Sequence, residues 1–380
     1  MMKDKFQKQR QQQKKGRASH SKRTTPSLLK RVPRTTIIAI TTIICCSIPQ
    51  QPFFVDGCTT IGVGKRASTD GSVYCSHSND GEGDTDPRLV VIPASDWPSN
   101  VKRSIYYSPE SFPRFVGSDR ASSLVEAYEP SSIDNSLSFA STATSNIAAA
   151  SFDPICVIDQ AEHTYRYFEE TYGALNEKQL GMAESTCSGV FGAAPKGVTV
   201  EGVKGKACFS IDALTQIGME RHDNARKAIE EMGRLAVDMG FYGAGMFEGS
   251  AESLIVTDKE EVWVFHILPD PTGTSAIWAA QRVPDDEFVV VANAFIIREI
   301  DPNDDENFMY SESVYTVAKD LGWWSSSSSS SSSGNNLLDF TALYSDGEYS
   351  NKYYSGRRAW GVFHLFAPSL ALSSEYKEWR

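Results

Sequence analysis

The sequence predicts an α+β protein in which antiparallel hairpins outnumber helices. Short stretches of alternating apolar and polar residues recur along the chain, as in strands with one buried face. The dipeptide Asp70-Gly71 separates two such stretches and favours a tight hairpin turn. The clearest helical spacing of apolar residues covers 211–239. Hairpins with few helices favour packed α+β layers over a doubly wound parallel sheet.

The first predicted hairpin pairs a strand over 59–63 with one over 72–76, and a short strand over 88–93 follows. Residues 94–150 are rich in Ser, Pro and Ala, which predicts loops with short strands. The later elements are two strands within 165–183, further strands over 253–257, 261–268, 274–282 and 288–292, and helices over 211–239 and 311–321.

A nine-serine run over 325–333 leads into Gly334 and two asparagines. Such a segment cannot bury a core, so we expect a flexible insertion in a surface loop. No internal repeat is visible on either side of it.

Charge divides the chain into two parts. Residues 1–57 carry 12 Lys or Arg against two Asp, a net charge of +10, whereas residues 58–380 have 25 basic and 46 acidic residues, a net charge of −21. Because nucleic-acid binding needs a basic surface, the acidic part is not expected to bind nucleic acid. The basic part is followed at once by an apolar stretch, which favours a targeting function for it.

That apolar stretch covers 35–48 and ends before Pro49. It is shorter than the roughly 20 residues of a spanning helix and has the length of a signal-peptide core. We therefore predict a leader over 1–57, a mature domain over 58–380 and a secreted, vacuolar or lysosomal location. A signal anchor before processing is the alternative, and no stable membrane association is expected afterwards. A homo-oligomer is compatible with the sequence.

Seven cysteines occur, two of them in the leader: Cys45, Cys46, Cys58, Cys75, Cys156, Cys187 and Cys208. If Cys58 stays free, the last four allow up to two disulfides, and their pairing does not follow from the sequence. No CxxC or Cys/His spacing indicates zinc, so neither a metal nor another cofactor is predicted.

Cys58 stands where the acidic part begins. Cleavage of the Gly57–Cys58 bond would leave an α-amine, with a pKa of about 7.7–8.0, beside a thiol with a pKa of about 8.5. One residue would then supply both the nucleophile and its general base, as N-terminal threonine does in related chemistry. Cys58 is thus the predicted nucleophile.

Several short motifs support that prediction by their order. They are residues 58–73, Asn176-Glu177, Ala183-Glu184-Ser185-Thr186, Glu261-Val262-Trp263, the segment 281–286, Ala292-Asn293 and Ser355-Gly356-Arg357-Arg358. Together they resemble the cysteine dipeptidases of the N-terminal nucleophile (Ntn) hydrolase superfamily, of the dipeptidase A type, with the secernins as relatives. The resemblance covers residues 58 to about 370.

The resemblance implies a four-layer αββα sandwich with two stacked antiparallel sheets. It also implies autocatalytic removal of the leader and hydrolysis of short peptides, mainly dipeptides. Two alternatives remain: an Ntn acylase for a non-peptide amide, and a non-catalytic secernin-like protein with secretory or interaction functions. Relatives also continue beyond the position of Arg380, so a C-terminally truncated domain is an expectation.

The resemblance further implies the supporting site residues. Asp80 would hold the amine or thiol of Cys58, and Asn176 and Asn293 would donate hydrogen bonds to the oxyanion, Asn176 by its side chain or its backbone N–H. The adjacent Arg357 and Arg358 would face opposite sides of an extended segment, so one of them is expected to pair with Asp80 or to orient Cys58. Arg357 is the predicted site residue, and Arg358 is the alternative. Related acylases carry an arginine near the position of His77, which is expected to replace it as a cation at mildly acidic pH. A loop carboxylate cluster at Glu82, Asp84 and Asp86 is a weak signal with three interpretations: a calcium site, a solvated loop, which is the more common case, and a source of negative potential for a substrate's free α-amine.

Overall fold

The computed structural model describes residues 57–80, 89–107, 154–200, 202–246, 249–325 and 337–374. They belong to one unit, Asp56–Arg380. The predicted leader before Gly57, the carboxylate cluster of the loop after Asp80 and the serines after Ser325 lie outside the described residues.

An eight-stranded antiparallel sheet contains most of the long strands. Its order is β18 (Phe308–Tyr310), β15 (Ala276–Val283), β14 (Val262–Pro269), β13 (Ala251–Thr257), β10 (Gly181–Cys187), β9 (Gly173–Asn176), β8 (Tyr167–Glu169) and β3 (Val90–Ile92). Every residue of β13 and β14 is buried. Strands covered on both faces are buried along their whole length, which agrees with the largely apolar sequence of β14, whereas β13 also buries Glu252, Ser253 and Thr257.

A smaller antiparallel sheet contains the strand that follows Cys58. Its order is β16 (Phe288–Val291), β1 (Thr59–Val63) and β2 (Tyr74–Ser78). Strands β1 and β2 pack on β10 and β13 of the large sheet. A Cβ atom on Gly62 would lie 2.7 Å from Val262 Cγ1 and 2.9 Å from Ile255 Cγ2. Glycine at this position therefore permits the close approach of the two sheets.

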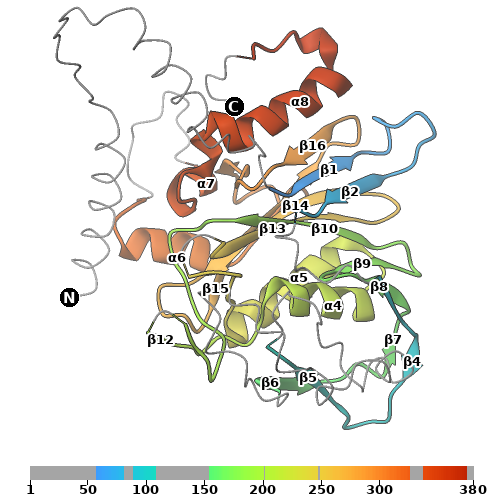
Figure 1. The fold of residues 1–380 in the computed structure, drawn as a ribbon, viewed down its shortest axis with the longest axis vertical. Helices are drawn as coiled ribbons and strands as arrows, with labels where there is room; N and C mark the ends of the chain where they lie inside the picture. The colour runs from blue at the N-terminus through green and yellow to red at the C-terminus, as the bar shows by residue number, and fades with distance from the viewer. Residues whose placement is uncertain are drawn as a thin grey trace, which may run out of the picture. The chain divides into compact units, whose positions relative to one another are not determined.

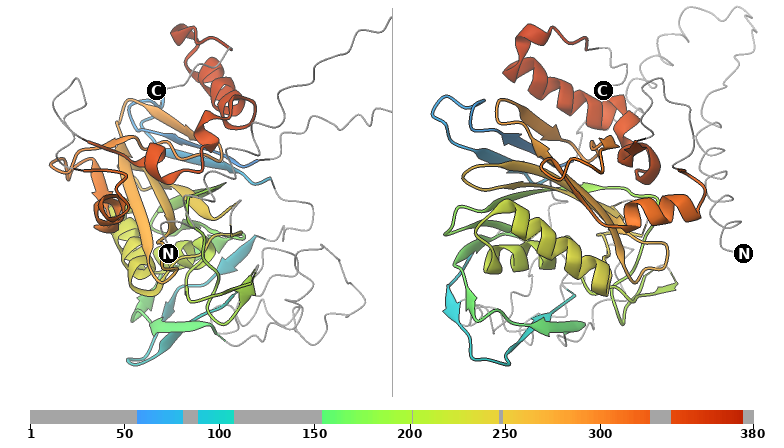
Figure 2. Two further views of the ribbon diagram at one scale, coloured as in Figure 1. Left: turned by 90° about the vertical axis from the view of Figure 1, so that its left-hand side faces the viewer. Right: turned by 180° about the vertical axis from the view of Figure 1, so that it is seen from behind.

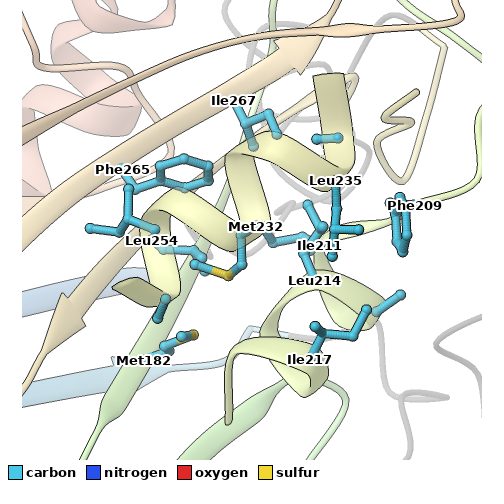
Figure 3. Packing of buried hydrophobic residues seen from close by; sticks show 14 of the residues in the cluster. Met182, Phe209, Ile211, Leu214, Ile217, Met232, Leu235, Leu254, Phe265 and Ile267 are labelled. Carbon is cyan, nitrogen blue, oxygen red and sulfur yellow. The ribbon is translucent and has the colours of Figure 1, made fainter. Parts of the chain in front are cut away.

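Helices α4 (Ile211–Arg221) and α5 (Ala225–Met239) cover the other face of the large sheet (Figure 1). Figure 3 shows the core between them, in which Leu214, Ile217 and Met232 are completely buried. Burial of each such side chain contributes about 1.5–3 kcal/mol. The helical spacing over 211–239 predicted one stretch, and the structure has two helices because Asn224 caps α5 by accepting from Lys227 N at 3.0 Å.

Helix α8 (Arg357–Phe366) lies against the small sheet on the side away from the large one, as Figure 2 shows. The ring of Phe288 on β16 contacts Phe363 and Phe366, with centroid distances of 5.0 and 5.6 Å. The layers therefore run from α8 through the small and large sheets to α4 and α5. The predicted α+β class is confirmed.

The remaining elements are short. They are the strand pairs β4 (Ser95–Asp96) with β7 (His163–Thr164), β5 (Lys102–Ile105) with β6 (Cys156–Asp159), β11 (Thr199–Val200) with β12 (Val203–Lys204) and β17 (Glu299–Ile300) with β19 (Leu338–Asp339), the helices α6 (Ser313–Asp320) and α7 (Phe340–Tyr344), and the helical turns η2 (Glu348–Ser350), η3 (Lys352–Gly356) and η4 (Pro368–Leu370).

One disulfide, Cys156–Cys208, joins β6 to the segment before α4. The other described cysteines, Cys58, Cys75 and Cys187, form no disulfide. Within the described ranges, no helix combines the length and the apolar character needed to cross a membrane.

Candidate active site

The thiol of Cys58 is buried between the two sheets, directly before β1. Because β1 pairs with β2 so that Thr59 faces Ser78, Cys58 comes opposite the end of β2. Its Sγ lies 3.9 Å from Oδ1 of Asn79, within reach of a weak S–H···O hydrogen bond. The start of the first hairpin thus positions the predicted nucleophile.

Two further side chains approach the same thiol. Cys58, His77 on β2 and Glu184 on β10 each direct a heteroatom to a region where all three atoms lie within 4.8 Å of one another. Nε2 of His77 is 3.8 Å from Oε2 of Glu184, and Oε1 of Glu184 accepts a hydrogen bond from Thr186 Oγ1 at 2.8 Å. The packing of β2 on β10 brings the three together.

His77 does not have the predicted charge. Burial lowers the pKa of its imidazole to about 4. The ring is therefore neutral at mildly acidic pH, and the prediction that His77 replaces an arginine as a cation is wrong.

Asn293 follows β16 in a left-handed conformation, with φ of 49°. Its backbone N–H donates to Ser185 Oγ at 2.9 Å, and its Nδ2 donates to the Thr186 carbonyl oxygen at 2.6 Å. Its Oδ1 accepts from Nη1 of Arg358 at 2.8 Å. Three contacts thus fix an uncommon backbone conformation that asparagine tolerates better than most residues. The structure brings Asn293 to the Cys58 region through Arg358.

Arg358, rather than Arg357, is the arginine at the site. Its Nη1 donates to the carbonyl oxygen of Cys58 and, at 3.3 Å, to Thr59 Oγ1. Its Nη2 donates to the Ala292 carbonyl oxygen at 3.1 Å. The prediction of Arg357 is wrong because the segment is a helix start, not an extended strand, and there the Arg357 side chain is exposed.

Asp80 lies beside the bond that precedes Cys58. Its carboxylate accepts a hydrogen bond from the backbone N–H of Gly57. Asp80 is exposed, and its contact is with the residue before the thiol. Asp80 and Arg358 therefore contact the main chain on either side of the Gly57–Cys58 bond, and Asn293 is joined to them through Arg358.

Asn176 binds the end of α4 and makes structural hydrogen bonds there. Its Nδ2 donates to the carbonyl oxygens of Met219 at 3.0 Å and His222 at 2.8 Å. Its Oδ1 accepts from the N–H groups of Lys178 and Leu180, and its own N–H donates to the Leu180 carbonyl oxygen. Both amide hydrogens and the backbone N–H are engaged. Asn176 fixes the β9–β10 turn to the end of α4, so the structure does not support its predicted oxyanion role.

The other free thiols are in environments that keep them protonated. Burial raises the pKa of Cys187 well above its usual value. The carboxylates of Glu348, Glu252 and Glu184 raise that pKa further. Burial also raises the pKa of the Cys75 thiol. Neither thiol is poised to act as a nucleophile at neutral pH.

Glu184, Ser185 and Thr186 lie at the candidate site, although no role was predicted for them from the sequence. They lie on β10, and Ser185 and Thr186 anchor Asn293. The signal in the sequence was a run of three polar residues, Glu184 to Thr186, within the strand Gly181–Cys187. Buried polar groups require hydrogen-bond partners, and here the partners are residues of the site.

Known proteins resemble this chain over most of its length. The model of peptidase family C69 matches residues 156–378. A probable dipeptidase of Salmonella dublin is 24% identical over 326 residues, which is 83% of this chain and 59% of the relative. A probable dipeptidase B of Lactococcus lactis subsp. lactis is 25% identical over 324 residues, 84% of this chain and 50% of the relative. The chain thus spans between half and three fifths of the length of these two relatives.

Proposed function

Because the chain belongs to peptidase family C69, we propose that it is a cysteine-type dipeptidase whose nucleophile is the Cys58 thiol. The observation that carries the proposal is that Asp80 and Arg358 bind the main chain on either side of the Gly57–Cys58 bond, at the Gly57 N–H and at the Cys58 carbonyl oxygen, and that Arg358 also binds Asn293. Restraint of both residues that flank one main-chain bond, beside a buried thiol, favours an intramolecular reaction at that bond. The named relatives, two probable dipeptidases, favour short peptides as substrates.

The first step we propose is self-cleavage. The Cys58 sulfur attacks the Gly57 carbonyl carbon, the C–N bond breaks, and the thiol proton passes to the nitrogen, which becomes the α-amine of Cys58. Water then hydrolyses the thioester and releases Gly57 as a carboxylate. Asp80 holds the Gly57 N–H and so restrains the residue before the bond, while Arg358 holds the Cys58 carbonyl oxygen. Such restraint favours an intramolecular attack.

The mature enzyme would then act on peptides by the same thiol. The Cys58 amine, with a pKa of about 7.7–8.0, accepts the thiol proton as sulfur attacks the scissile carbonyl. The second N–H of the Asn293 amide is the proposed oxyanion donor, since the first binds Thr186. The amine returns its proton to the leaving nitrogen, and water releases the acyl group.

The electrostatics favour a substrate with a free α-ammonium group. Glu184 and Glu252 are buried on β10 and β13, and Glu348 accepts two hydrogen bonds from Ser188. These carboxylates raise the pKa of Cys187 and so create a negative potential behind the site. A dipeptide carries an ammonium group one residue from its scissile bond, which such a potential attracts.

We also propose that the observed layers are the Ntn-hydrolase sandwich and that residues 1–57 direct the chain into the secretory route. The order of α8, two stacked antiparallel sheets and a helix pair supports the first proposal. The basic and apolar leader sequence supports the second.

The decisive experiment compares Cys58→Ser with Cys75→Ser in the full chain. Intact mass and N-terminal sequencing follow cleavage, and hydrolysis of a dipeptide panel and of N-acyl amino acids follows activity. We expect Cys58→Ser to remain uncut and inactive and Cys75→Ser to mature and hydrolyse dipeptides. Normal cleavage and turnover by Cys58→Ser would refute the nucleophile assignment. Hydrolysis of N-acyl amino acids alone would replace the dipeptidase with an acylase.

A further inference from the structure

Three potential metal-ligand atoms from distant parts of the chain meet between the sheets. The sulfur of Cys58, a ring nitrogen of His77 and a carboxylate oxygen of Glu184 lie within 4.8 Å of one another. They come from the segment before β1, from β2 and from β10. In the proposed catalytic mechanism the first of these residues reacts, Glu184 contributes only negative potential, and His77 has no role.

The spacing of the three atoms suits a small tetrahedral ion. Zinc bonds of about 2.0–2.3 Å place the donors of a tetrahedral site roughly 3.3–3.8 Å apart. The distance of 3.8 Å between His77 Nε2 and Glu184 Oε2 already meets that requirement. Closing the widest separation in the group, 4.8 Å at most, needs movements of about 1 Å, which side-chain rotation supplies.

The donor set selects the kind of metal. A thiolate, an imidazole and a carboxylate together favour Zn²⁺, whereas Mg²⁺ and Ca²⁺ prefer oxygen ligands alone. Nε2 of His77 is buried and makes no hydrogen bond to any residue in the described part of the chain. A buried ring nitrogen without such a bond is suited to ligation.

The surrounding charges favour a cation at this place. Glu184 supplies one carboxylate, and Glu252 and Glu348 lie close enough to raise the pKa of Cys187 together with it. Arg358 is a positive charge near this place. Its Nη1 donates hydrogen bonds to the carbonyl oxygen of Cys58 and to Oδ1 of Asn293. Local negative charge thus offsets part of the cost of burying a divalent ion.

We propose that Cys58, His77 and Glu184 bind one Zn²⁺, with water as the fourth ligand. On binding, the Cys58 thiol releases its proton to solvent and a sulfur–zinc bond forms. The bound sulfur cannot attack a carbonyl carbon, so the ion reversibly blocks the thiol. The binding site depends only on the three side chains, whereas the consequence that Zn²⁺ inhibits peptide hydrolysis rests on the proposed function.

Zinc binding to the full chain is measured by competition with a chromophoric chelator, without thiol reductants. We expect one equivalent to bind, and each of Cys58→Ser, His77→Gln and Glu184→Gln to lose at least about tenfold in affinity. The matched controls Cys75→Ser, His163→Gln and Glu260→Gln should retain it. Equal affinity in the wild type and the three ligand variants would overturn the site. Thermal melting curves verify that each variant is folded. If Glu184→Gln does not fold, the affinity of His77→Gln decides the test.

Two readouts identify the sulfur ligand directly. Co²⁺ in place of Zn²⁺ should produce a thiolate-to-cobalt absorption band that Cys58→Ser lacks and Cys75→Ser retains. Zn²⁺ should slow alkylation of Cys58 by iodoacetamide, followed by peptide mass spectrometry. An unchanged alkylation rate at saturating Zn²⁺ would overturn the inference even if dipeptide hydrolysis is observed. Zinc binding without any hydrolysis would leave the site standing and refute the proposed function instead.

Discussion

Nη1 of Arg358 donates a hydrogen bond to Oδ1 of Asn293 over 2.8 Å. The same nitrogen donates to the carbonyl oxygen of Cys58, and the guanidinium stacks on Tyr354, 4.4 Å from the ring centroid. One side chain on α8 therefore sets the positions of the predicted nucleophile and of the proposed oxyanion donor.

Replacement of Arg358 should reduce activity far more than replacement of Arg357. Arg358→Ala removes donors to Cys58, Thr59, Asn293 and Ala292, and we expect kcat/KM for a dipeptide to fall by about a hundredfold or more. Arg357→Ala removes an exposed side chain and should stay within about twofold of wild type. Steady-state kinetics of the two variants decide between the arginines, and an equal loss in both would contradict the placement of Arg358.

A side chain at Gly57 should slow maturation without altering the mature enzyme. A Cβ atom there would lie 2.7 Å from Asn293 Oδ1 and 2.8 Å from Arg358 Nη1. Displacement of these groups by Gly57→Ala should slow cleavage by about tenfold or more. Gly361→Ala, where a Cβ meets no atom within 4 Å, is the control. The fraction that does mature has lost Gly57, so its specific activity must equal that of wild type; a lower value would argue against cleavage after Gly57.

The two asparagines should separate activity from stability. Asn293→Ala should cost about 2.7–4 kcal/mol in transition-state stabilisation if it donates to the oxyanion. Asn176→Ala leaves the carbonyl groups of Met219 and His222 without their amide donor, and we expect it to lower the free energy of unfolding by about 1–3 kcal/mol. Kinetics at a temperature where both variants are folded, together with urea titration, measure the two effects. Comparable losses of kcat in both variants would support the oxyanion role that the sequence predicted for Asn176.

The stability of the fold should depend on pH through His266. Its Nε2 accepts from the N–H groups of Ile296 at 2.9 Å and Ile297 at 3.3 Å, and burial lowers the pKa of the ring to about 3. The unfolded chain, with a His pKa of about 6.5, binds a proton that the folded protein excludes. The stabilisation is complete above pH 6.5 and is lost as the pH falls toward 3.

Urea unfolding of wild type and His266→Gln at two pH values tests this dependence. Between pH 7 and pH 5 the wild type should lose about 2 kcal/mol more than the variant, in which the glutamine oxygen replaces the ring acceptor. His163→Gln, at an exposed histidine, should lose as much as the wild type. Identical pH dependence in wild type and His266→Gln would show that His266 does not control acid stability.

Sequence patterns located most strands because period-two alternation and turn dipeptides are local signals. The predicted strand over 59–63 coincides with β1, and that over 288–292 exceeds β16 by one residue. The helix around Arg358 was missed because a segment with few apolar contacts to the core gives weak periodicity; no residue of α8 is buried. The family resemblance predicted from ordered motifs is confirmed by the match to peptidase family C69.

The residues of the candidate site were only partly predictable because most of them lie far from one another in the sequence. Cys58 stood at a charge boundary, and Asn293 ended an apolar run, so both were detectable. The contact of His77 with Glu184 arises from the stacking of two sheets, which no spacing along the chain encodes. The absence of a Cys/His spacing therefore could not exclude a metal site there.

Cys58 and Arg358 are 300 positions apart, yet a hydrogen bond joins them. During synthesis the Gly57–Cys58 bond leaves the ribosome long before α8 does. A nascent chain that still lacks α8 carries the bond to be cut but not the guanidinium that positions it. On the proposed function, removal of the leader would then report that translation has passed Arg358 and that α8 has docked, so copies without a docked α8 would keep the leader attached to Cys58.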